Sequence, residues 1–350
     1  MSAPHEGVHV RHDTAPNGAG WTLSLRRTTC DRPEPIEHRH ATPRRPVLIV
    51  PGYGMNSFIF GFHPRGRSLE AHLAYRGFEV WSVDLRDQGR ARRTHAREGA
   101  LYGLADLALV DVRAAIDHVL AHTETGATKV DIVGCSLGAA IMFIEATVGG
   151  DDRMASLVSL GGPLRWEKVH PLVSVAFRSP RLAGMLSMRG TRSIIRKVAP
   201  PLVPVLKRVP QILSIYLNST VTDISRLGEM VETVEDPIPR INQEIAEWIL
   251  QRDLHVRGVN VSEAVARLRN PLLCIVAGAD GIVPPETARS PYHLSRAQSR
   301  RVLEVGGRDL PIAHADLFLC HDAERILFEP LAQWLAEQDD AWTAEPLSAR

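Results

Sequence analysis

Long apolar segments are absent from this 350-residue sequence. No run approaches the roughly 18 residues that a membrane-spanning helix needs. The first residues, MSAPHEGVHVRHDT, also contain no apolar stretch of the kind found in secretory signal peptides. We therefore expect a protein with neither a transmembrane helix nor a signal peptide.

An excess of one charge sign is also absent, because 41 Lys and Arg residues balance 40 Asp and Glu residues, a net charge of +1. Nucleic-acid binding relies on basic surface, so we expect no nucleic-acid partner. Cysteine is scarce, and the four cysteines are far apart and match no metal-binding spacing: Cys30, Cys135, Cys274 and Cys320. We expect free thiols in a reducing cytoplasm, and neither a metal nor a cofactor.

The sequence contains a regular alternation of apolar runs. Residues 7–29 predict a β-hairpin, and a charged, proline-rich connector with His38 and His40 follows it. No carboxylate–histidine framework surrounds this histidine pair, so a solvated linker is the better interpretation. From Pro46 onward, short β-branched runs alternate with helical segments, which predicts an α/β fold with a mostly parallel sheet covered on both faces.

This alternation stops for about a hundred residues and then resumes. From Leu164 to Leu268 the pattern is helical and punctuated by prolines, with no convincing strand. We predict a core at residues 1–163 and 269–350, with a helical cap at 164–268. Between Arg165 and Pro210 ten Lys or Arg residues accompany one acid, Glu167. This basic stretch predicts either a solvated outer face of the cap or a surface that contacts lipid.

The stretch DIVGCSLGAA, residues 131–140, passes directly from a predicted strand into a predicted helix. Its G-x-S-x-G pattern is typical of a strained elbow that exposes one nucleophilic side chain. Glycine at 134 and 138 relieves the steric collision of such a turn. The central residue is Ser136, so we expect Ser136 to attack and Cys135 to pack inside.

An acid and a base follow downstream, each after a predicted strand. LLCIVAGADGIVP places Asp280 in a loop, and EVGGRDLPIAHADLF places His314 in the next loop. The order Ser, Asp, His matches that of α/β hydrolases, and the strands would bring the three residues to one edge of the sheet. Asp309 or His321 could instead be the partner, and Asp316 is expected to hold the loop.

Attack on a carbonyl also requires N–H donors for the oxyanion. We expect one donor to be the N–H of Leu137, directly after the nucleophile. The other should come from the loop IVPGYGMNS, where the N–H of Tyr53 is the best candidate and Gly52 permits close approach. An ordinary glycine turn is the alternative interpretation.

The chain resembles the α/β-hydrolase superfamily at VPGYG, VDLRDQGR, GCSLG, AGADGIVP and AHADL. The loop and helix of residues 55–81 are similar to the lipase branch and, more distantly, to polyhydroxyalkanoate polymerases. Two positions depart from the family pattern: Pro51 replaces a histidine, and Asp87 replaces a glycine. The polymerases use a cysteine nucleophile, whereas the central residue here is Ser136.

The residues and the resemblance together predict a serine hydrolase that cleaves a small or lipid-like acyl ester through an acyl-enzyme. One alternative is acyl transfer, or polyester synthesis or depolymerisation, by the same triad with a different acceptor. A second alternative is a catalytically silent, lipid-binding relative. Because dehalogenases and epoxide hydrolases use an aspartate nucleophile, Ser136 argues against both.

Overall fold

A computed structural model describes residues 7–34, 36, 44–94, 101–185, 190, 193, 197, 214–307 and 309–343. The basic residues Arg192 and Arg196 and the histidines His38 and His40 lie outside the described residues. In the described part of the chain, strands form a nine-stranded sheet with the order β1-β2-β4-β3-β6-β7-β10-β11, and β5 pairs with β2. The strands span β1 Val8–Pro16, β2 Trp21–Cys30, β3 Val47–Val50, β4 Val80–Asp84, β5 Arg92–Arg93, β6 Val130–Cys135, β7 Met154–Leu160, β10 Leu272–Ala277 and β11 Arg300–Val305.

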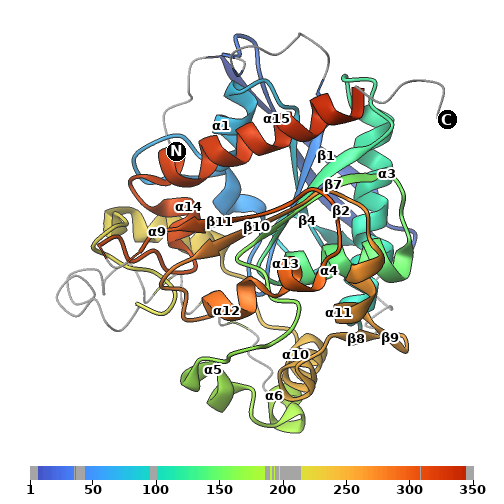
Figure 1. Cartoon of the computed structure of the whole chain (residues 1–350), viewed down its shortest axis with the longest axis vertical. Helices are drawn as coiled ribbons and strands as arrows, with labels where there is room; N and C mark the ends of the chain where they lie inside the picture. The colour runs from blue at the N-terminus through green and yellow to red at the C-terminus, as the bar shows by residue number, and fades with distance from the viewer. Residues whose placement is uncertain are drawn as a thin grey trace.

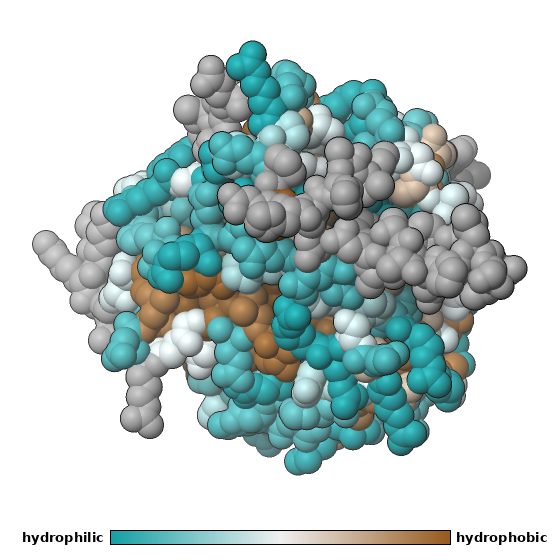
Figure 2. Space-filling view, turned by 45° about the horizontal axis from the view of Figure 1, so that its top comes forward, coloured by the Kyte–Doolittle hydropathy of each residue, from teal (hydrophilic) through white to brown (hydrophobic). Residues whose placement is uncertain are grey.

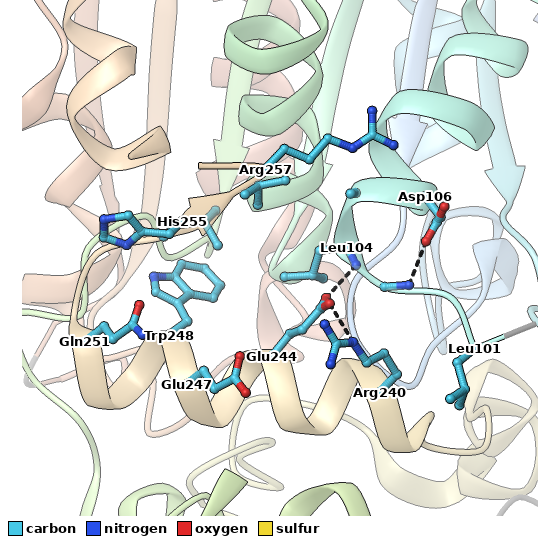
Figure 3. A pocket seen from close by; sticks show the side chains of 14 residues that line it. Leu101, Leu104, Asp106, Arg240, Glu244, Glu247, Trp248, Gln251, His255 and Arg257 are labelled. Atoms are coloured by element: carbon cyan, nitrogen blue, oxygen red, sulfur yellow. Dashed lines mark hydrogen bonds and ion pairs between the residues drawn. The ribbon is translucent and has the colours of Figure 1, made fainter. Parts of the chain in front are cut away.

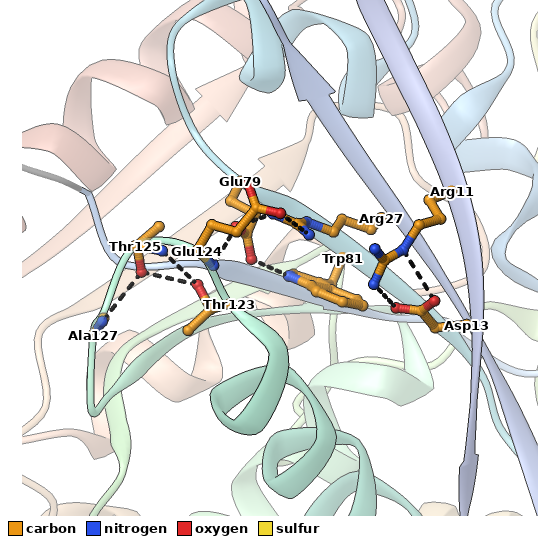
Figure 4. A network of polar contacts seen from close by, with 9 residues as sticks. All are labelled: Arg11, Asp13, Arg27, Glu79, Trp81, Thr123, Glu124, Thr125 and Ala127. Atoms are coloured by element: carbon orange, nitrogen blue, oxygen red, sulfur yellow. Dashed lines mark hydrogen bonds and ion pairs between the residues drawn. The ribbon is translucent and has the colours of Figure 1, made fainter.

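The predicted hairpin and the predicted parallel sheet are both confirmed. Strands β1 and β2 pair antiparallel and join the sheet through β4, while β4, β3, β6, β7, β10 and β11 run parallel. A partly buried polar network supports this hairpin (Figure 4): Arg27 of β2 donates at 2.8 Å to both the buried Glu79 and the exposed Glu124, and the Trp81 indole donates to Glu79 at 2.6 Å. The network therefore ties the antiparallel edge of the sheet to the parallel strands and to the loop after helix α3 (Arg113–His122).

Each face of the sheet carries its own hydrophobic core, because side chains alternate along every strand. Leu48, Ile132 and Cys274 belong to the core under the helices η2, α3 and α4. Ile49, Val133 and Ile275 belong to the core under α1 and α15 (Figure 1). These helices span α1 Leu69–Tyr75, α2 Leu104–Asp106, η2 Leu107–Val112, α3 Arg113–His122, α4 Leu137–Ile144, η3 Glu145–Gly149, η9 Glu324–Phe328 and α15 Glu329–Thr343.

The segment between β7 and β10 contributes no strand to the sheet among its described residues. Its helices span α5 Pro171–Ala176, α6 Pro180–Met185, η6 Ile224–Arg226, α9 Leu227–Met230, η7 Val231–Thr233, α10 Pro239–Gln251, α11 Val261–Ala264 and η8 Val265–Arg267. In Figure 1, α5, α6 and α10 lie together below the sheet, whereas α9 lies apart from them on the left. The expectation of no strand here is wrong, because β8 His255–Val256 and β9 Val259–Asn260 form a small hairpin. Two-residue strands leave too short a pattern for alternation to be seen. The boundaries at 164 and 268 stay predictions.

The last short elements are η1 Ser57–Gly61, α12 Pro285–Ala288, α13 Ser290–Leu294 and α14 Asp316–Leu319. None of the helices in the described ranges is long and apolar enough to cross a bilayer. The described cysteines are all free thiols, as expected, and Cys135 and Cys274 are buried in β6 and β10.

Candidate active site

Ser136 lies at the junction of β6 and α4 with strained backbone angles, φ 51° and ψ −120°. Both neighbouring glycines are sterically required. A Cβ at Gly134 would lie 2.5 Å from the Ala139 Cα, and one at Gly138 would lie 2.3 Å from the Val50 carbonyl oxygen. Real Cβ atoms do not approach this closely, so the predicted elbow and the role of its two glycines are present in the structure.

Cys135 and Ser136 face different surroundings. Cys135 packs into the core under α1 and α15, and burial raises the pKa of its thiol well above the ordinary value, with a smaller contribution from the negative charge of Asp280. A thiolate is the reactive form of cysteine, so this environment suppresses nucleophilicity. Ser136 is 8% exposed, at the start of α4. Burial therefore disfavours Cys135 as a nucleophile, and the role of Ser136 stays a prediction.

Asp280 and His314 are brought together as expected. The His314 Nδ1 lies 2.6 Å from the Asp280 Oδ2, and both side chains are buried. The other oxygen of Asp280, Oδ1, accepts the N–H groups of Ile282 and Val283, each at 2.8 Å. The alternatives Asp309 and His321 are exposed. Both carboxylate oxygens of Asp280 therefore have hydrogen-bond partners, Oδ2 in His314 and Oδ1 in its own loop.

A pair of glycines after β7 lies against both His314 and Ser136. A Cβ at Gly161 would lie 3.5 Å from the His314 Cε1, and one at Gly162 would lie 3.0 Å from the Ser136 carbonyl oxygen. Among the described residues, no hydrogen bond joins the Ser136 hydroxyl to the His314 ring. Such bonds often tighten only when substrate is bound. This GG pair was not among the predicted site residues, although a double glycine directly after a strand is a signal visible in the sequence.

The loop after β3 approaches Ser136 closely. A Cβ at Gly52 would lie 2.9 Å from the Ser136 Cβ, so only glycine fits there. Within the described chain, the N–H groups of Tyr53 and Leu137 donate to no protein acceptor. An oxyanion needs unpaired N–H donors of this kind, and the assignment of Tyr53 and Leu137 to that role stays a prediction.

Residues of the predicted cap hold this loop in place, which sequence patterns did not reveal. The Tyr53 hydroxyl donates to the Asn242 side chain of α10, and its ring meets Phe177 edge-on at 6.5 Å. Burial raises the pKa of Tyr53 to about 12. One residue further along, Gly54 accepts the N–H of Glu235 at 2.8 Å. The loop is thus anchored to the cap at Tyr53 and at the residue that follows it.

The two departures from the family pattern have different structural outcomes. Asp87 adopts φ 58°, a left-handed conformation that aspartate tolerates, and accepts the Tyr102 hydroxyl at 2.9 Å. Pro51 directly precedes Gly52 in the loop against Ser136, where its carbonyl oxygen would meet a Cβ at Gly138 at 2.6 Å. Both Asp87 and Pro51 are therefore accommodated by the loops that contain them.

A separate cavity of about 410 Å³ lies between α10, the start of α2 and the β8–β9 hairpin. Figure 3 shows its polar rim, where Arg240 pairs with Glu244 and Glu244 accepts the Leu104 N–H. None of the predicted site residues lines it. Among the described residues, no group of three or more His, Cys, Asp or Glu side chains could hold a metal ion.

The model of the alpha/beta hydrolase family matches residues 47–340. The chain belongs to this family. No curated protein sequence matches it. The family assignment and the α/β-hydrolase fold predicted from the sequence are both confirmed, whereas the similarity to polyhydroxyalkanoate polymerases stays a prediction.

Solved structures similar to this α/β hydrolase include a soluble variant of monoglyceride lipase from Saccharomyces cerevisiae, at 14% identity and TM-score 0.63, covering 97% of this chain and 98% of that one. A thermophilic esterase from Thermogutta terrifontis shares 17% identity at TM-score 0.60, covering 94% and 99%. A bromoperoxidase from Bacillus anthracis shares 11% identity at TM-score 0.56, covering 94% and 100%. At these identities the similarity establishes the fold, and the reaction must be argued from the site.

Proposed function

We propose that this α/β hydrolase is a serine esterase that cleaves a carboxylic ester through an acyl-enzyme on Ser136. The observation that carries the proposal is the 2.6 Å contact between His314 and Asp280, beside a serine held at φ 51°. A nucleophile, a base and an orienting acid are the three parts that acyl transfer needs.

The reaction begins when the Ser136 hydroxyl attacks the ester carbonyl and His314 Nε2 takes its proton. The N–H groups of Leu137 and Tyr53 stabilise the resulting oxyanion. The protonated His314 then gives its proton to the departing alcohol, which leaves an acyl-Ser136. Water attacks this acyl-enzyme with His314 again as the base, and the acid is released. Asp280 keeps the Nδ1 proton in place throughout.

The substrate is proposed to be small or lipid-like. Four of the large apolar side chains that are exposed in the described chain lie in α5 and α6: Leu172, Val175, Leu182 and Met185. Arg178 and Arg181 lie in the same stretch, and no acid does. An apolar and basic surface favours contact with an anionic lipid surface. The face shown in Figure 2 is mostly hydrophilic, with one apolar band across its left half.

The test is a panel of p-nitrophenyl esters of increasing chain length, with pre-steady-state detection of a burst. Ser136→Ala should lower kcat by on the order of 10⁴–10⁶ because the triad works as a unit. Cys135→Ala, the matched control one residue away, should keep most activity. An inactive Cys135→Ala with an active Ser136→Ala would refute the assignment. Adding an alcohol acceptor during turnover distinguishes hydrolysis from the alternative of acyl transfer.

A further inference from the structure

Residues 214–222, within the predicted cap, form a strap across the two loops that carry Asp280 and His314. The strap makes backbone hydrogen bonds to both loops. Gly281 donates to the Ile215 carbonyl at 3.0 Å, and Ala315 donates to the Tyr216 carbonyl at 2.7 Å. The Tyr216 ring lies 6.2 Å from the His314 ring, measured between centroids. A segment far away in sequence thus borders the acid and the base together.

Asp316 joins this strap to the His314 loop at a point shielded from solvent. The side chain is fully buried and accepts three different donors. These are the Ala313 N–H at 2.8 Å, the Asn218 N–H at 3.0 Å and the Thr222 hydroxyl at 2.7 Å. A buried carboxylate is costly unless it is hydrogen-bonded, and here the donors come from both segments. Asp316 therefore connects the two segments through one group.

We propose that Asp316 is a positioning residue that sets the place of the His314 ring by latching residues 214–222 onto the His314 loop. The inference rests on the proposed function of His314 as the base. The N–H before His314, that of Ala313, binds Asp316, and the N–H after it, that of Ala315, binds the strap. The backbone is therefore held on both sides of the histidine, once directly by Asp316 and once through the strap.

Asp316 acts through its neighbours and is no member of the triad, because His314 already bonds to Asp280. Burial raises the pKa of Asp316 to about 6, outweighing the three donors. The carboxylate is consequently ionised at pH 8, where all three contacts can form. A purely structural role would change stability alone, whereas a positioning role must change the chemical step in a folded protein.

The experiment compares four full-length proteins at pH 8: wild type, Asp316→Asn, Thr222→Val and Thr220→Val. Thr220 is the matched control, since its exposed hydroxyl donates to the side-chain oxygen of Asn218, whereas Asp316 accepts the backbone N–H of Asn218. Asp316→Asn should lower kcat by roughly 10- to 100-fold, because displacement of a catalytic group by about 1 Å can cost 10²-fold. Thr222→Val should lower kcat about threefold, and Thr220→Val should match wild type. KM should stay within about twofold in all four proteins, because the strap positions the base His314 and affects the chemical step more than substrate binding.

Two further measurements keep the outcomes distinct. The first is the rate at which a fluorophosphonate labels the protein, which depends on the base and should fall in parallel with kcat. The second is hydrogen exchange of a peptide containing Ala313 and Ala315, which should quicken in Thr222→Val relative to Thr220→Val whatever the activity. A folded Asp316→Asn or Thr222→Val protein with wild-type kcat and labelling would overturn the proposal.

If Asp316→Asn does not fold, the comparison of Thr222→Val with Thr220→Val tests the proposal by the same measurements of kcat, labelling and exchange. If the wild type neither labels nor hydrolyses esters, the proposed function fails. The latch is then judged by exchange alone, and equal exchange in the two threonine variants overturns it.

Discussion

Replacing Asp280 by asparagine tests the site most directly, because the structure dictates which way the new amide must face. The Asp280 Oδ1 accepts two backbone N–H groups, from Ile282 and Val283, each at 2.8 Å. An amide nitrogen there would face both donors and lose both bonds, so the amide oxygen keeps this position. The amide NH2 then points at the His314 Nδ1, which lies 2.6 Å from the carboxylate oxygen in the native protein.

An NH2 group in that place donates to Nδ1, and this forces the His314 proton onto Nε2. The wrong tautomer cannot take a proton from the Ser136 hydroxyl. The expected loss is about 10⁴ in kcat, the scale seen when the corresponding aspartate of a serine protease becomes asparagine. At about 1.4 kcal/mol for each tenfold step, this loss is roughly 5 kcal/mol of transition-state stabilisation. The fold should survive, since the two loop bonds remain.

The assay is hydrolysis of a short p-nitrophenyl ester at pH 8, beside thermal unfolding of the same samples. Asp322→Asn is the control, because Asp322 is exposed and its side chain pairs with Arg325 of the helix that follows it. A folded Asp280→Asn protein that keeps more than about a tenth of wild-type kcat would refute the tautomer argument and direct attention to another carboxylate, such as Asp309.

Three other predictions concern the loop after β3, a buried acid and the predicted cap. Gly52→Ala should slow fluorophosphonate labelling by about 10²-fold, since its Cβ would lie 2.9 Å from the Ser136 Cβ. Gly307→Ala is the control, because a Cβ at Gly307 meets open space, and this variant should label at the wild-type rate. Equal labelling rates in the two variants would contradict the prediction. Burial raises the pKa of Glu145 to about 7, so between its ordinary pKa of about 4.5 and pH 7 the folded state binds a proton that the unfolded state lacks. The free energy of unfolding should therefore fall as pH rises across that window, by up to about 1.4 kcal/mol per pH unit, and urea titrations of Glu145→Gln should lose this slope. Neutralising Arg192, Arg196 and Lys197 together should weaken co-sedimentation with anionic vesicles by on the order of 10²-fold at low salt, and less at high salt, with soluble-ester turnover unchanged; equal, salt-independent sedimentation would leave the basic stretch as a solvated face.

Local patterns were enough to predict the longer strands of the sheet, the covering helices and the elbow, but not the two-residue strand β5. A strand buried on both faces is a continuous apolar run, and a turn with no space for a Cβ needs glycine, so both leave a mark within a few residues. For the same reason the β1–β2 hairpin was visible in residues 7–29. The β8–β9 hairpin was missed because its strands, two residues each, are shorter than any periodicity.

The sequence by itself determined the order Ser136, Asp280, His314, because each follows a recognisable strand, and it left Asp309 and His321 open as alternatives. Only the tertiary structure joined Asp280 to His314 and left Asp309 and His321 exposed. Tyr53 and Asn242, which share a hydrogen bond, are 189 residues apart in the sequence. Asp316 is at least 94 residues away from the segment 214–222 that it binds. No local pattern encodes contacts over such separations. Hydrogen bonds between distant loops depend on where the whole sheet places their ends, and that placement is a property of the folded chain.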